Sequence, residues 1–489
     1  MKKLIFLISI LSCLAAEAQD NVGVNRWQTD WYASARMAGT TGEYMPFWAR
    51  TGEDGILPVR SSGLMTAGAD ISYRTPQDIF FETGANFAGA LSGKSPLNDS
   101  PSYAFIDRLY LSAGWKMFRM DVGLKPRHGD LGDLSITGGD VMLSGNARNL
   151  PGINLSSEWI YLERGKWFGV KGNLAHYHLF DNRCTQKPMV HDKSVAIRVA
   201  ADRRIELMAG FHHYAHWGGV SEVYGTYPFS VEDYIKIFFA KRGDENDSLS
   251  DQLNVFGNHL GNEWARLIYR MENYSLTFQY DKPFEDNSGM MFKNFPDGVW
   301  TLQLSAKDRN AIVTDVTCEY IYTMWQSGDT HDRPATEEEM AGQDPESPWY
   351  GRVVLGGMDN YFNNSHYHSG WTHYGRTMGL PLLTPAMPDE NGVCHGVVNT
   401  RVKGYNLGIK GVAANIPYKF RATYTENSGT YNKPFTEQPW QLSLALEASF
   451  SKDALPVEYT FGLYGDIGEL YQDSIGLTLK IAYRGGTRF

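Results

Sequence analysis

The sequence predicts an all-β fold: a transmembrane antiparallel β-barrel of about 18 strands whose long extracellular loops partly fill the lumen. Three observations carry this prediction. They are an export signal at the start of the chain, a composition rich in tyrosine and glycine, and long segments in which apolar and polar residues alternate. We expect residues 19–489 to form a single outer-membrane barrel domain.

Residues 1–18 have the features of a secretory signal peptide. Two lysines precede an apolar run from Leu4 to Ala16, and an Ala-Glu-Ala sequence ending at Ala18 forms a cleavage site flanked by small residues. Cys13 offers a lipoprotein signal as an alternative, but the Ala-Glu-Ala site downstream is better formed. We therefore expect a chain that is cleaved after Ala18 and exported to the cell outer membrane.

The composition narrows the class of protein. Aromatic residues make up 13% of the chain and charged residues only 20%, with 50 glycines and 28 tyrosines. Beyond the signal peptide no apolar run reaches the roughly 18 residues that a transmembrane helix needs. The formal net charge is −10 and no basic tract stands out, so we expect no nucleic-acid partner. An exported chain of this kind is either a large soluble β protein or a membrane-spanning β-barrel.

The end of the chain distinguishes these two alternatives. Counting back from the C-terminal Phe489, every second residue is mostly apolar or aromatic, and the residues between are small or cationic. Side chains of a strand alternate with period two, and strands of soluble proteins are usually about five or six residues long. An alternation this long therefore predicts a strand that crosses a bilayer, which takes roughly 9–11 residues. Similar alternation recurs at 109–117, 120–124, 276–280 and 442–450.

These segments give about eighteen candidate strands, an even number, as in single-chain bacterial barrels. Their ranges are 28–37, 63–74, 79–89, 105–116, 118–125, 157–163, 168–177, 194–201, 204–213, 263–271, 274–281, 299–307, 311–325, 399–411, 417–426, 439–450, 458–466 and 471–489. Short connections alternate with long ones at about 126–156, 214–262, 282–298 and 326–398. If the last strand runs down to a periplasmic C-terminus, every short turn is periplasmic and every long loop is extracellular.

The long connection at 214–262 contains a predicted helix. Ser230 takes the N-cap position and Asp233 the third helical position, the arrangement of a capping box. The apolar residues between 231 and 240 need a surface to bury against. We expect this helix to fold onto the barrel mouth.

No recognisable catalytic or metal-binding motif occurs in the chain. Only Cys184, Cys318 and Cys394 remain after cleavage; this odd, widely spaced set argues against a disulfide framework, although two of them could pair. His176 and His178 share one strand face and could hold a metal, but no third ligand can be placed beside them. We expect no cofactor, no metal and no enzymatic activity.

The densest group of side chains suited to sugars is the segment 359–376. Aromatic rings can cover the apolar faces of sugars, and Asn, Ser, Thr and His side chains exchange hydrogen bonds with their hydroxyls. Arg376 adds a planar fork for a uronate or another anionic group. The same aromatic residues could instead pack the loop into the lumen as a plug. The two interpretations are compatible, and the sequence leaves both open.

At this segment the sequence resembles the Wzi family of capsule assembly proteins in its Bacteroidetes form. The likeness is carried by residues 361–364 and 369–379, and by 144–153 and 257–261. It extends from about residue 46 to the C-terminus and implies an outer-membrane barrel that binds capsular polysaccharide or exopolysaccharide and promotes its attachment at the cell surface. The candidate polysaccharide-binding residues are Tyr361, Asn363, Asn364, His368, Trp371, Tyr374, Arg376, Arg148 and Asn149.

The expected partners are surface polysaccharide and outer-membrane lipid, with the polysaccharide export machinery as a further candidate, and we expect a monomer. An alternative function is a diffusion channel for oligosaccharides or anionic solutes, because Lys480, Arg484 and Arg488 would line the lumen. A hydrolase would need a catalytic pair that the sequence does not show.

Overall fold

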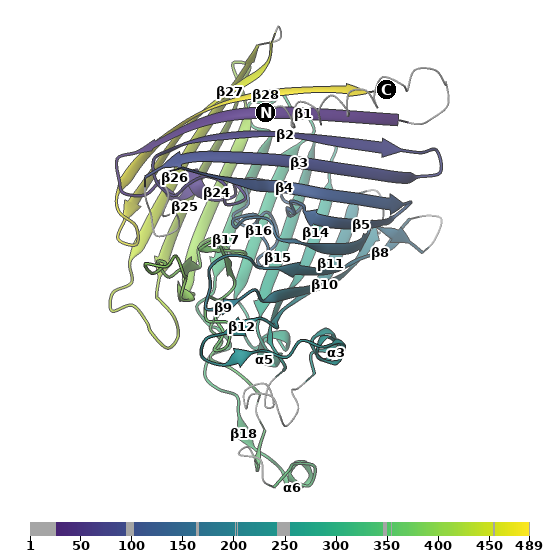
Figure 1. Cartoon of the computed structure of the whole chain (residues 1–489), viewed down its shortest axis with the longest axis vertical. Helices are drawn as coiled ribbons and strands as arrows, with labels where there is room; N and C mark the ends of the chain where they lie inside the picture. The colour runs from purple at the N-terminus through teal and green to yellow at the C-terminus, as the bar shows by residue number, and fades with distance from the viewer. Residues whose placement is uncertain are drawn as a thin grey trace.

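The computed structural model describes residues 26–93, 102–162, 166–200, 202, 204–241, 255–345, 350–353, 355–452 and 455–488. Within them the chain forms a closed antiparallel barrel of eighteen long strands, in which β1 (Arg26–Thr40) pairs with β28 (Ser474–Arg488) to close the sheet (Figure 1). The predicted fold class is confirmed. The predicted signal peptide at 1–18 lies outside the described residues. Among the helices of the described ranges, none has the length and apolar character to cross a membrane.

Between β1 and β28 the wall strands follow one another around the barrel in chain order. They are β2 (Ser62–Arg74), β3 (Ile79–Ser92), β4 (Ser102–Trp115), β5 (Phe118–Leu124), β6 (Pro151–Ser157), β8 (Phe168–His178), β10 (Met189–Ala200), β11 (Ile205–Trp217), β14 (Asn258–Arg270), β15 (Tyr274–Phe284), β16 (Gly298–Ala306), β17 (Asp315–Tyr322), β24 (Val402–Ala413), β25 (Ile416–Asn427), β26 (Trp440–Lys452) and β27 (Leu455–Gly468).

The connections contain short elements. The helices are α2 (Phe47–Arg50), α3 (Val231–Phe239), α5 (Asn287–Met290) and α6 (Glu337–Met340). The minor strands are β7 (Ile160–Tyr161), β9 (Thr185–Gln186), β12 (Val220–Ser221), β13 (Gly225–Thr226), β18 (Arg333–Pro334), β19 (Arg352–Val353), β20 (Thr372–His373), β21 (Arg376–Thr377), β22 (Thr384–Pro385) and β23 (Val397–Asn399).

Each predicted strand overlaps an observed one, but the sixth was misplaced. It was predicted at 157–163, where the structure has only the end of β6 and the two residues of β7. The aromatic residues Trp159 and Tyr161 suggested a strand at that position. The observed alternation of Ile153 and Leu155 instead begins two residues after Pro151. β10 and β14 also begin about five residues earlier than predicted, because outward positions in their first halves carry His191 and Lys193, and His259 and Glu263, rather than apolar residues.

Alternation decides which side of each strand faces outward. On β28, Ile475, Leu477 and Ile481 are exposed, whereas the alternate residues Ser474 and Thr478 are buried. On β4, Leu111 is 65% exposed and the neighbouring Ser112 only 4%. The apolar residues therefore lie on the outside of the barrel and the polar residues in the lumen, as a lipid-facing wall requires.

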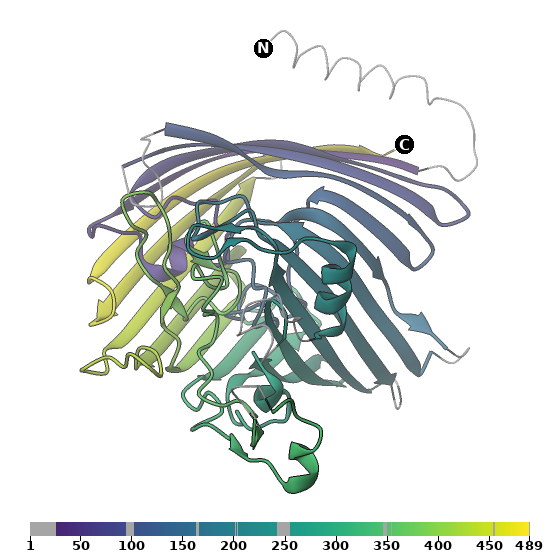
Figure 2. The same cartoon turned by 60° about the horizontal axis from the view of Figure 1, so that its bottom comes forward.

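The two ends of the barrel differ. β1 begins and β28 ends at the same end, where Gln28 pairs with Arg488. Tight turns such as 116–117 and 414–415 lie there, while the connections 41–61, 125–150, 218–257, 285–297 and 323–401 lie at the other end. We call the first the terminal end and the second the loop end (Figure 2). By the usual asymmetry of such barrels, the terminal end is periplasmic and the loop end extracellular.

Three of the long connections fold into the lumen and form a plug, which we define as residues 41–61, 125–150 and 355–401. Its centre is an apolar core in which Trp48, Met142, Phe362 and Trp371 are buried together with lumen-facing wall residues such as Tyr214. The loops thus contribute a hydrophobic core that the polar lumen surface of the wall could not form. The interpretation of 359–376 as a lumen-filling segment is therefore borne out by the packing.

Wall carboxylates hold the plug by accepting its backbone N–H groups. Glu319 on β17 accepts from the N–H of Ile136 at 2.8 Å, and Asp281 on β15 from that of Val141 at 2.7 Å. Asp466 on β27 accepts from the N–H of Phe47 at 2.8 Å. Buried N–H groups that are not in a sheet or helix need such partners, and hydrogen bonds to a charged acceptor are the stronger kind.

A second, smaller core lies outside the wall. Met189, Ala215 and Trp217 face outward from β10 and β11 and are buried against Ile237 of α3 and Phe256. The capping box of Ser230 and Asp233 forms as predicted. The expectation that the helix folds onto the mouth needs correction, because α3 packs against the outside of the wall at the loop end. The outward-facing series of β11 continues through Trp217, so the strand offers apolar cover there and not over the lumen.

We predict that Glu319→Ala weakens the plug. The change removes the acceptor shared by Ser135, Ile136, Thr301 and Asn406. Leaving buried donors unpaired should cost about 2–4 kcal/mol. The measurement is the thermal denaturation midpoint in detergent, followed by circular dichroism, which should fall. Glu337→Ala, on the exposed helix α6, is the control; equal midpoints for the two variants would contradict the anchoring role of Glu319.

Candidate functional site

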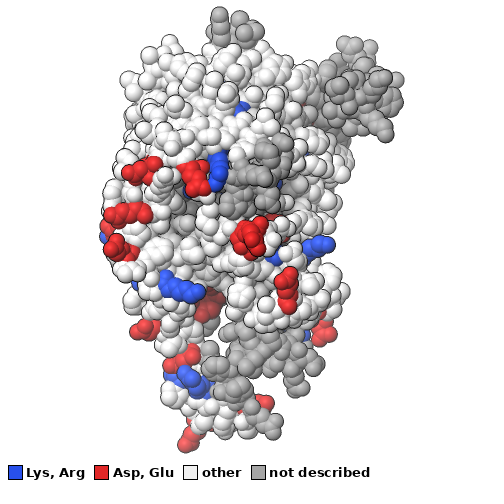
Figure 3. All heavy atoms as spheres, turned by 60° about the vertical axis from the view of Figure 1, so that its left-hand side comes forward, with Lys and Arg blue, Asp and Glu red and all other residues white. Residues whose placement is uncertain are grey.

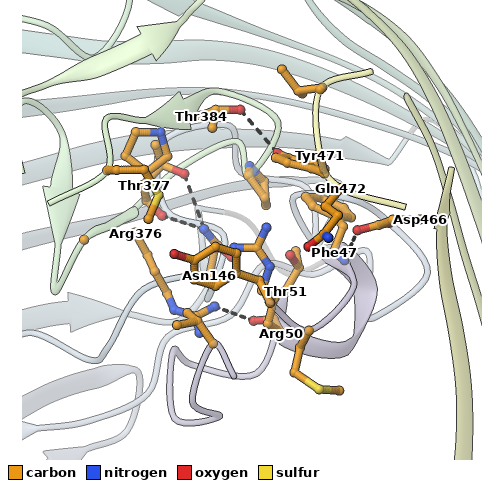
Figure 4. Close-up of a pocket in the computed structure, with 18 of the residues that line it drawn as sticks. Phe47, Arg50, Thr51, Asn146, Arg376, Thr377, Thr384, Asp466, Tyr471 and Gln472 are labelled. Carbon is orange, nitrogen blue, oxygen red and sulfur yellow. Dashed lines mark hydrogen bonds between the residues drawn. The ribbon is translucent and has the colours of Figure 1, made fainter. Parts of the chain in front are cut away.

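A cavity of about 300 Å³ lies at the loop end, between the plug and the rim of the barrel (Figure 4). Three segments far apart in the sequence enclose it: the β1–β2 loop, the plug segment 375–388 and the β27–β28 connection. Its volume is at the lower end of the range for ligand pockets, about 300–1,000 Å³. The site is therefore suited to a short stretch of a ligand.

Aromatic rings form one side of the cavity. The rings of Phe47 and Tyr471 are nearly parallel, with centroids 6.4 Å apart. Helix α2 positions Phe47, whose N–H is bonded to Asp466, and the backbone N–H of Tyr471 donates to Gln441 Oε1 at 2.9 Å. Both rings are thus fixed by lumen-facing side chains of the wall rather than by their own loops alone.

Two arginines, Arg50 and Arg376, and two carboxylates, Glu43 and Asp466, line the cavity. Both carboxylates have partners, because Glu43 is paired with Arg60 and Asp466 accepts from the N–H of Phe47. Arg376 is largely buried and donates to the carbonyls of Arg50 at 2.6 Å and Leu57 at 2.8 Å. Burial and the neighbouring Arg50 and Arg148 lower the pKa of the Arg376 guanidinium to about 9. Arg376 therefore joins the 41–61 loop to the 375–388 segment while remaining cationic at neutral pH.

Arg50 has a different environment. Its guanidinium carbon lies 5.5 Å from the centre of the Tyr471 ring, and its Nε has no hydrogen-bond partner. In the part of the chain that the structure describes, it forms no salt bridge. An arginine held over an aromatic ring and left with unused donors is suited to bind a carboxylate or another anion.

Neutral polar groups complete the lining. Asn146 donates to the carbonyl of Thr377 at 3.0 Å, and the hydroxyls of Thr384 and Tyr471 lie 3.3 Å apart. Gln472, which is exposed, also lines the cavity. These groups can both donate and accept, which sugar hydroxyls require.

The face on this side of the loop end carries no broad positive patch. Figure 3 shows the left-hand side of Figure 1, where acidic side chains are more frequent than basic ones and both are scattered among uncharged ones. An anionic ligand would therefore be recognised by individual cations such as Arg50 rather than by a broad positive field.

Two of the aromatic residues predicted to bind polysaccharide lie inside the plug. Trp371 is fully buried, and its indole N–H donates to the carbonyl of Met142 at 2.7 Å. Tyr361 is also fully buried and donates to Asp297 Oδ2 at 2.8 Å. Both rings hold the plug together, and neither lines the cavity.

The predicted asparagines also bond within the chain. Asn363 donates to the carbonyl of Val397 and accepts from its N–H, each at 2.8 Å. Asn364 accepts from the N–H of His366 at 2.8 Å and donates to Asn258 at 3.1 Å. His368 is exposed at the surface of the plug.

The remaining candidates form a separate stack. The Arg148 guanidinium lies between the rings of Phe105 and Tyr374, 3.9 Å and 4.4 Å from their centres. Tyr374 is 40% exposed, and Asn149 donates to the carbonyl of Asp107 at 3.4 Å. Among the nine predicted residues, Arg376 is the one that lines the cavity.

Sequence reasoning missed Phe47, Arg50 and Tyr471. Tyr471 lies more than 400 positions from Phe47 and Arg50 along the chain, and no local pattern marks any of them. It also missed a row of three polar groups: Cys184 Sγ lies 3.4 Å from His395 Nδ1, and His395 Nε2 lies 3.0 Å from Asp389. The N–H of Cys184 already donates to Ser369, and none of the three lines the cavity, so we assign no reaction to them. Among the described residues no group of His, Cys, Asp or Glu side chains is arranged to hold a metal ion.

A closed antiparallel barrel with an apolar outer face, tight turns at the terminal end and long loops at the other defines the class of outer-membrane β-barrel proteins. The chain matches no family model and no curated protein. Its fold is similar to that of solved structures.

One of these is Wzi of Escherichia coli, described as an outer membrane protein involved in group 1 capsule assembly and a carbohydrate-binding β-barrel. The identity is 13%, the match covers 97% of this chain and 87% of that chain, and the TM-score is 0.54. A second is Acinetobacter baumannii OccAB4: the identity is 11%, the match covers 96% of this chain and 99% of that chain, and the TM-score is 0.46. A third is Pseudomonas aeruginosa OpdK with vanillate: the identity is 9%, the match covers 94% of this chain and 99% of that chain, and the TM-score is 0.47. At such identities the likeness shows the shared fold.

We predict that Asp54→Asn stabilises the protein at alkaline pH. Asp54 lies in the plug, where its N–H donates to the carbonyl of Gly145. Burial, reinforced by Asp107 and Glu53, raises its pKa from 3.8 to about 8. The stability linked to the protonated carboxyl is therefore fully present below pH 3.8 and is lost as the pH rises through about 8.

The measurement is the denaturation midpoint of both proteins at pH 4 and pH 9. The variant should be more stable than the native protein at pH 9, and the difference should shrink at pH 4. Glu390→Gln, on the exposed surface, serves as the control. A difference that is the same at both pH values would contradict the raised pKa.

Proposed function

We propose that this protein binds capsular polysaccharide or exopolysaccharide at the outer face of the outer membrane, in the manner of a lectin, and promotes its attachment to the cell surface. The observation that carries the proposal is the cavity at the loop end, which combines stacked aromatic rings, an unpaired arginine and neutral polar groups above a filled lumen. Such a site is built to hold a ligand outside the barrel and not to pass it through.

The ligand chemistry follows from the lining. The Tyr471 ring, which is partly exposed and is backed by the buried Phe47, suits the apolar face of a sugar, and Thr384, Gln472 and Asn146 suit its hydroxyls. Arg50 suits a negative group, such as the carboxylate of a uronic acid. We therefore propose an acidic polysaccharide as the ligand.

The residues identified from the sequence take two roles in this proposal. Trp371, Tyr361, Asn363 and Asn364 position the plug segment, whereas Arg376 forms the base of the cavity. Tyr374 and His368, which are exposed, and the stacked Arg148 with its neighbour Asn149 are proposed as further contacts for a polymer that extends over the plug.

The similarity to E. coli Wzi agrees with this proposal at the level of fold. That protein is described as carbohydrate-binding. The filled lumen of this chain also favours binding at the surface over transport of a solute. An export-machinery partner at the terminal end and a monomeric state are parts of the proposal that rest on the sequence resemblance.

We predict that Arg50→Ala and Tyr471→Ala each weaken polysaccharide binding roughly 10-fold or more, a loss of about 1.4 kcal/mol. The measurement is saturable binding of the purified protein in detergent to the producing strain's own capsule, with a neutral foreign polysaccharide as reference. Lys433→Ala, an exposed cation of the same end, is the matched control. Binding that is unchanged in all three variants, with normal melting, would place the site elsewhere.

A diffusion channel is the second candidate, and cavities on the terminal side of the plug favour it. Two of them measure about 510 Å³ and 470 Å³ and are lined by charged groups. Lys480 and Arg484 face one of them, as predicted, together with Glu53 and Asp70, so the lumen there is of mixed charge.

We predict that the native protein gives no steady conductance in planar lipid bilayers, because the apolar core of the plug fills the lumen. Glu319→Ala, which releases one anchor of the plug, should give intermittent openings. Steady native conductance, with no binding to the producing strain's capsule, would instead assign the protein to the channels.

A further inference from the structure

Two loop segments fold back over the outside of the barrel at the loop end. One is 229–240, which contains α3, and the other is 286–295, which contains α5. We call them together the collar. Both segments follow strands on the same side of the barrel, because β11, β14 and β15 are neighbours in the sheet (Figure 2).

The inner face of the collar covers outward-facing wall residues. His191 of β10 packs against Tyr234 with ring centres 5.5 Å apart, and Trp217 of β11 stacks on Phe229 at 5.1 Å. Phe284 of β15 is only 2% exposed, beneath Gly289 of α5. These residues occupy positions that face lipid elsewhere in the barrel.

The collar also covers charged groups that point out of the wall. Lys193 donates to the carbonyl of Phe238 and lies 4.4 Å from its ring centre. Lys282 is fully buried, forms an ion pair with Glu263 at 3.0 Å and lies 4.2 Å from the Phe292 ring. A bare lysine on the lipid face is unfavourable, by about 2–4 kcal/mol at the midplane and less near the interface. The collar replaces these outward charges by its own outer surface.

That outer surface is apolar. Val231, Ile235 and Phe239 are spaced four residues apart, so they form one face of α3, and Val231 is 77% and Phe239 63% exposed. In the second segment Met290, Met291, Phe292 and Phe295 are exposed. A contiguous exposed apolar surface on a folded protein marks an interaction site.

The position of the collar along the barrel axis identifies its partner. The apolar belt of such barrels is about 25 Å tall. On β28 the outward series from Ile475 to Tyr483 is uncovered, roughly 23 Å at a rise of about 3.3 Å and a tilt of about 40°. On β11 only the series from Ile205 to Phe211 faces outward uncovered, roughly 18 Å. The collar begins where the belt of β11 is cut short.

We propose that the collar is embedded in the outer leaflet of the membrane, with its apolar face among the lipid chains near the headgroups. It completes the lipid-facing belt on the side where β8, β10, β11, β14 and β15 carry histidine, lysine and glutamate on their outward face. Continuity with the belt below favours lipid over a protein partner. Lys241 is exposed, with its Nζ 5.9 Å from the centre of the Phe239 ring, so its stem can follow the apolar face while its ammonium meets headgroup anions. This proposal is independent of the ligand of the cavity.

The test measures where the collar side chains lie. A nitroxide is attached to Ile235→Cys or Phe292→Cys in the full chain with Cys184, Cys318 and Cys394 replaced by serine, and the protein is placed in lipid nanodiscs. Accessibility to oxygen, which concentrates in lipid, is compared with accessibility to a water-soluble nickel chelate. Leu207→Cys on the belt and Glu337→Cys on α6 are the lipid and water references. A difference in gel mobility between unheated and boiled samples, as for the native protein, shows that each labelled variant is folded.

The ratio of oxygen to nickel accessibility at 235 and 292 should match that at 207 and exceed that at 337 several-fold. A ratio equal to that of position 337 would place the collar in water and overturn the proposal. Low accessibility to both probes would also overturn it, because a second copy or another protein would then cover the collar; spin–spin broadening that depends on concentration would identify the second copy.

Discussion

The need to satisfy buried backbone polar groups is the constraint on which the rest of this structure depends. Wall strands meet this constraint through the hydrogen bonds of the closed sheet. The backbone groups of loops that enter the lumen lose their hydrogen bonds to water and gain none from a sheet. Here the deficit is met by carboxylates that point inward from the wall, with Glu319, Asp281 and Asp466 each accepting a plug N–H. Two of these three carboxylates are also bonded by side chains of neighbouring strands, namely Asn406 and Asn262. The plug is thus fixed to several strands at once, and its apolar core can form inside a polar lumen.

The candidate site depends on the same constraint. Asp466, which holds the N–H of Phe47, thereby sets the position of α2, and α2 carries Arg50 toward Tyr471. Arg376 is held in place, because its Nη1 and Nη2 donate to the carbonyls of Arg50 and Leu57. Arg376 is therefore held by hydrogen bonds within the chain, whereas Arg50 has unused donors. This difference in hydrogen bonding explains why Arg50, and not Arg376, is the better candidate to bind an anionic ligand.

The fold could be predicted from the sequence because its signal is repeated along the chain. Each outward residue must tolerate lipid, whereas an inward residue need not, so the strands themselves show an alternation such as that from Ile475 to Tyr483. The boundaries were less secure where the outward positions are not apolar, as at His191 and His259. The collar covers His191, and His259 is buried beside His213 and Phe256, so neither position has to be apolar.

The site could be predicted only in part, since its residues meet through the folding of loops. The segment 359–376 was identified by its composition, but composition does not tell a ring that binds sugar from a ring that packs a plug; Trp371 and Tyr361 are buried, while Tyr374 of the same segment is exposed. Arg50 and Tyr471 gave no signal, because each is an ordinary loop residue until the closure of β1 on β28 brings their loops together. The closing strand pair that defines the barrel therefore also assembles the cavity, and the most informative contact for function is one that no local stretch of sequence contains.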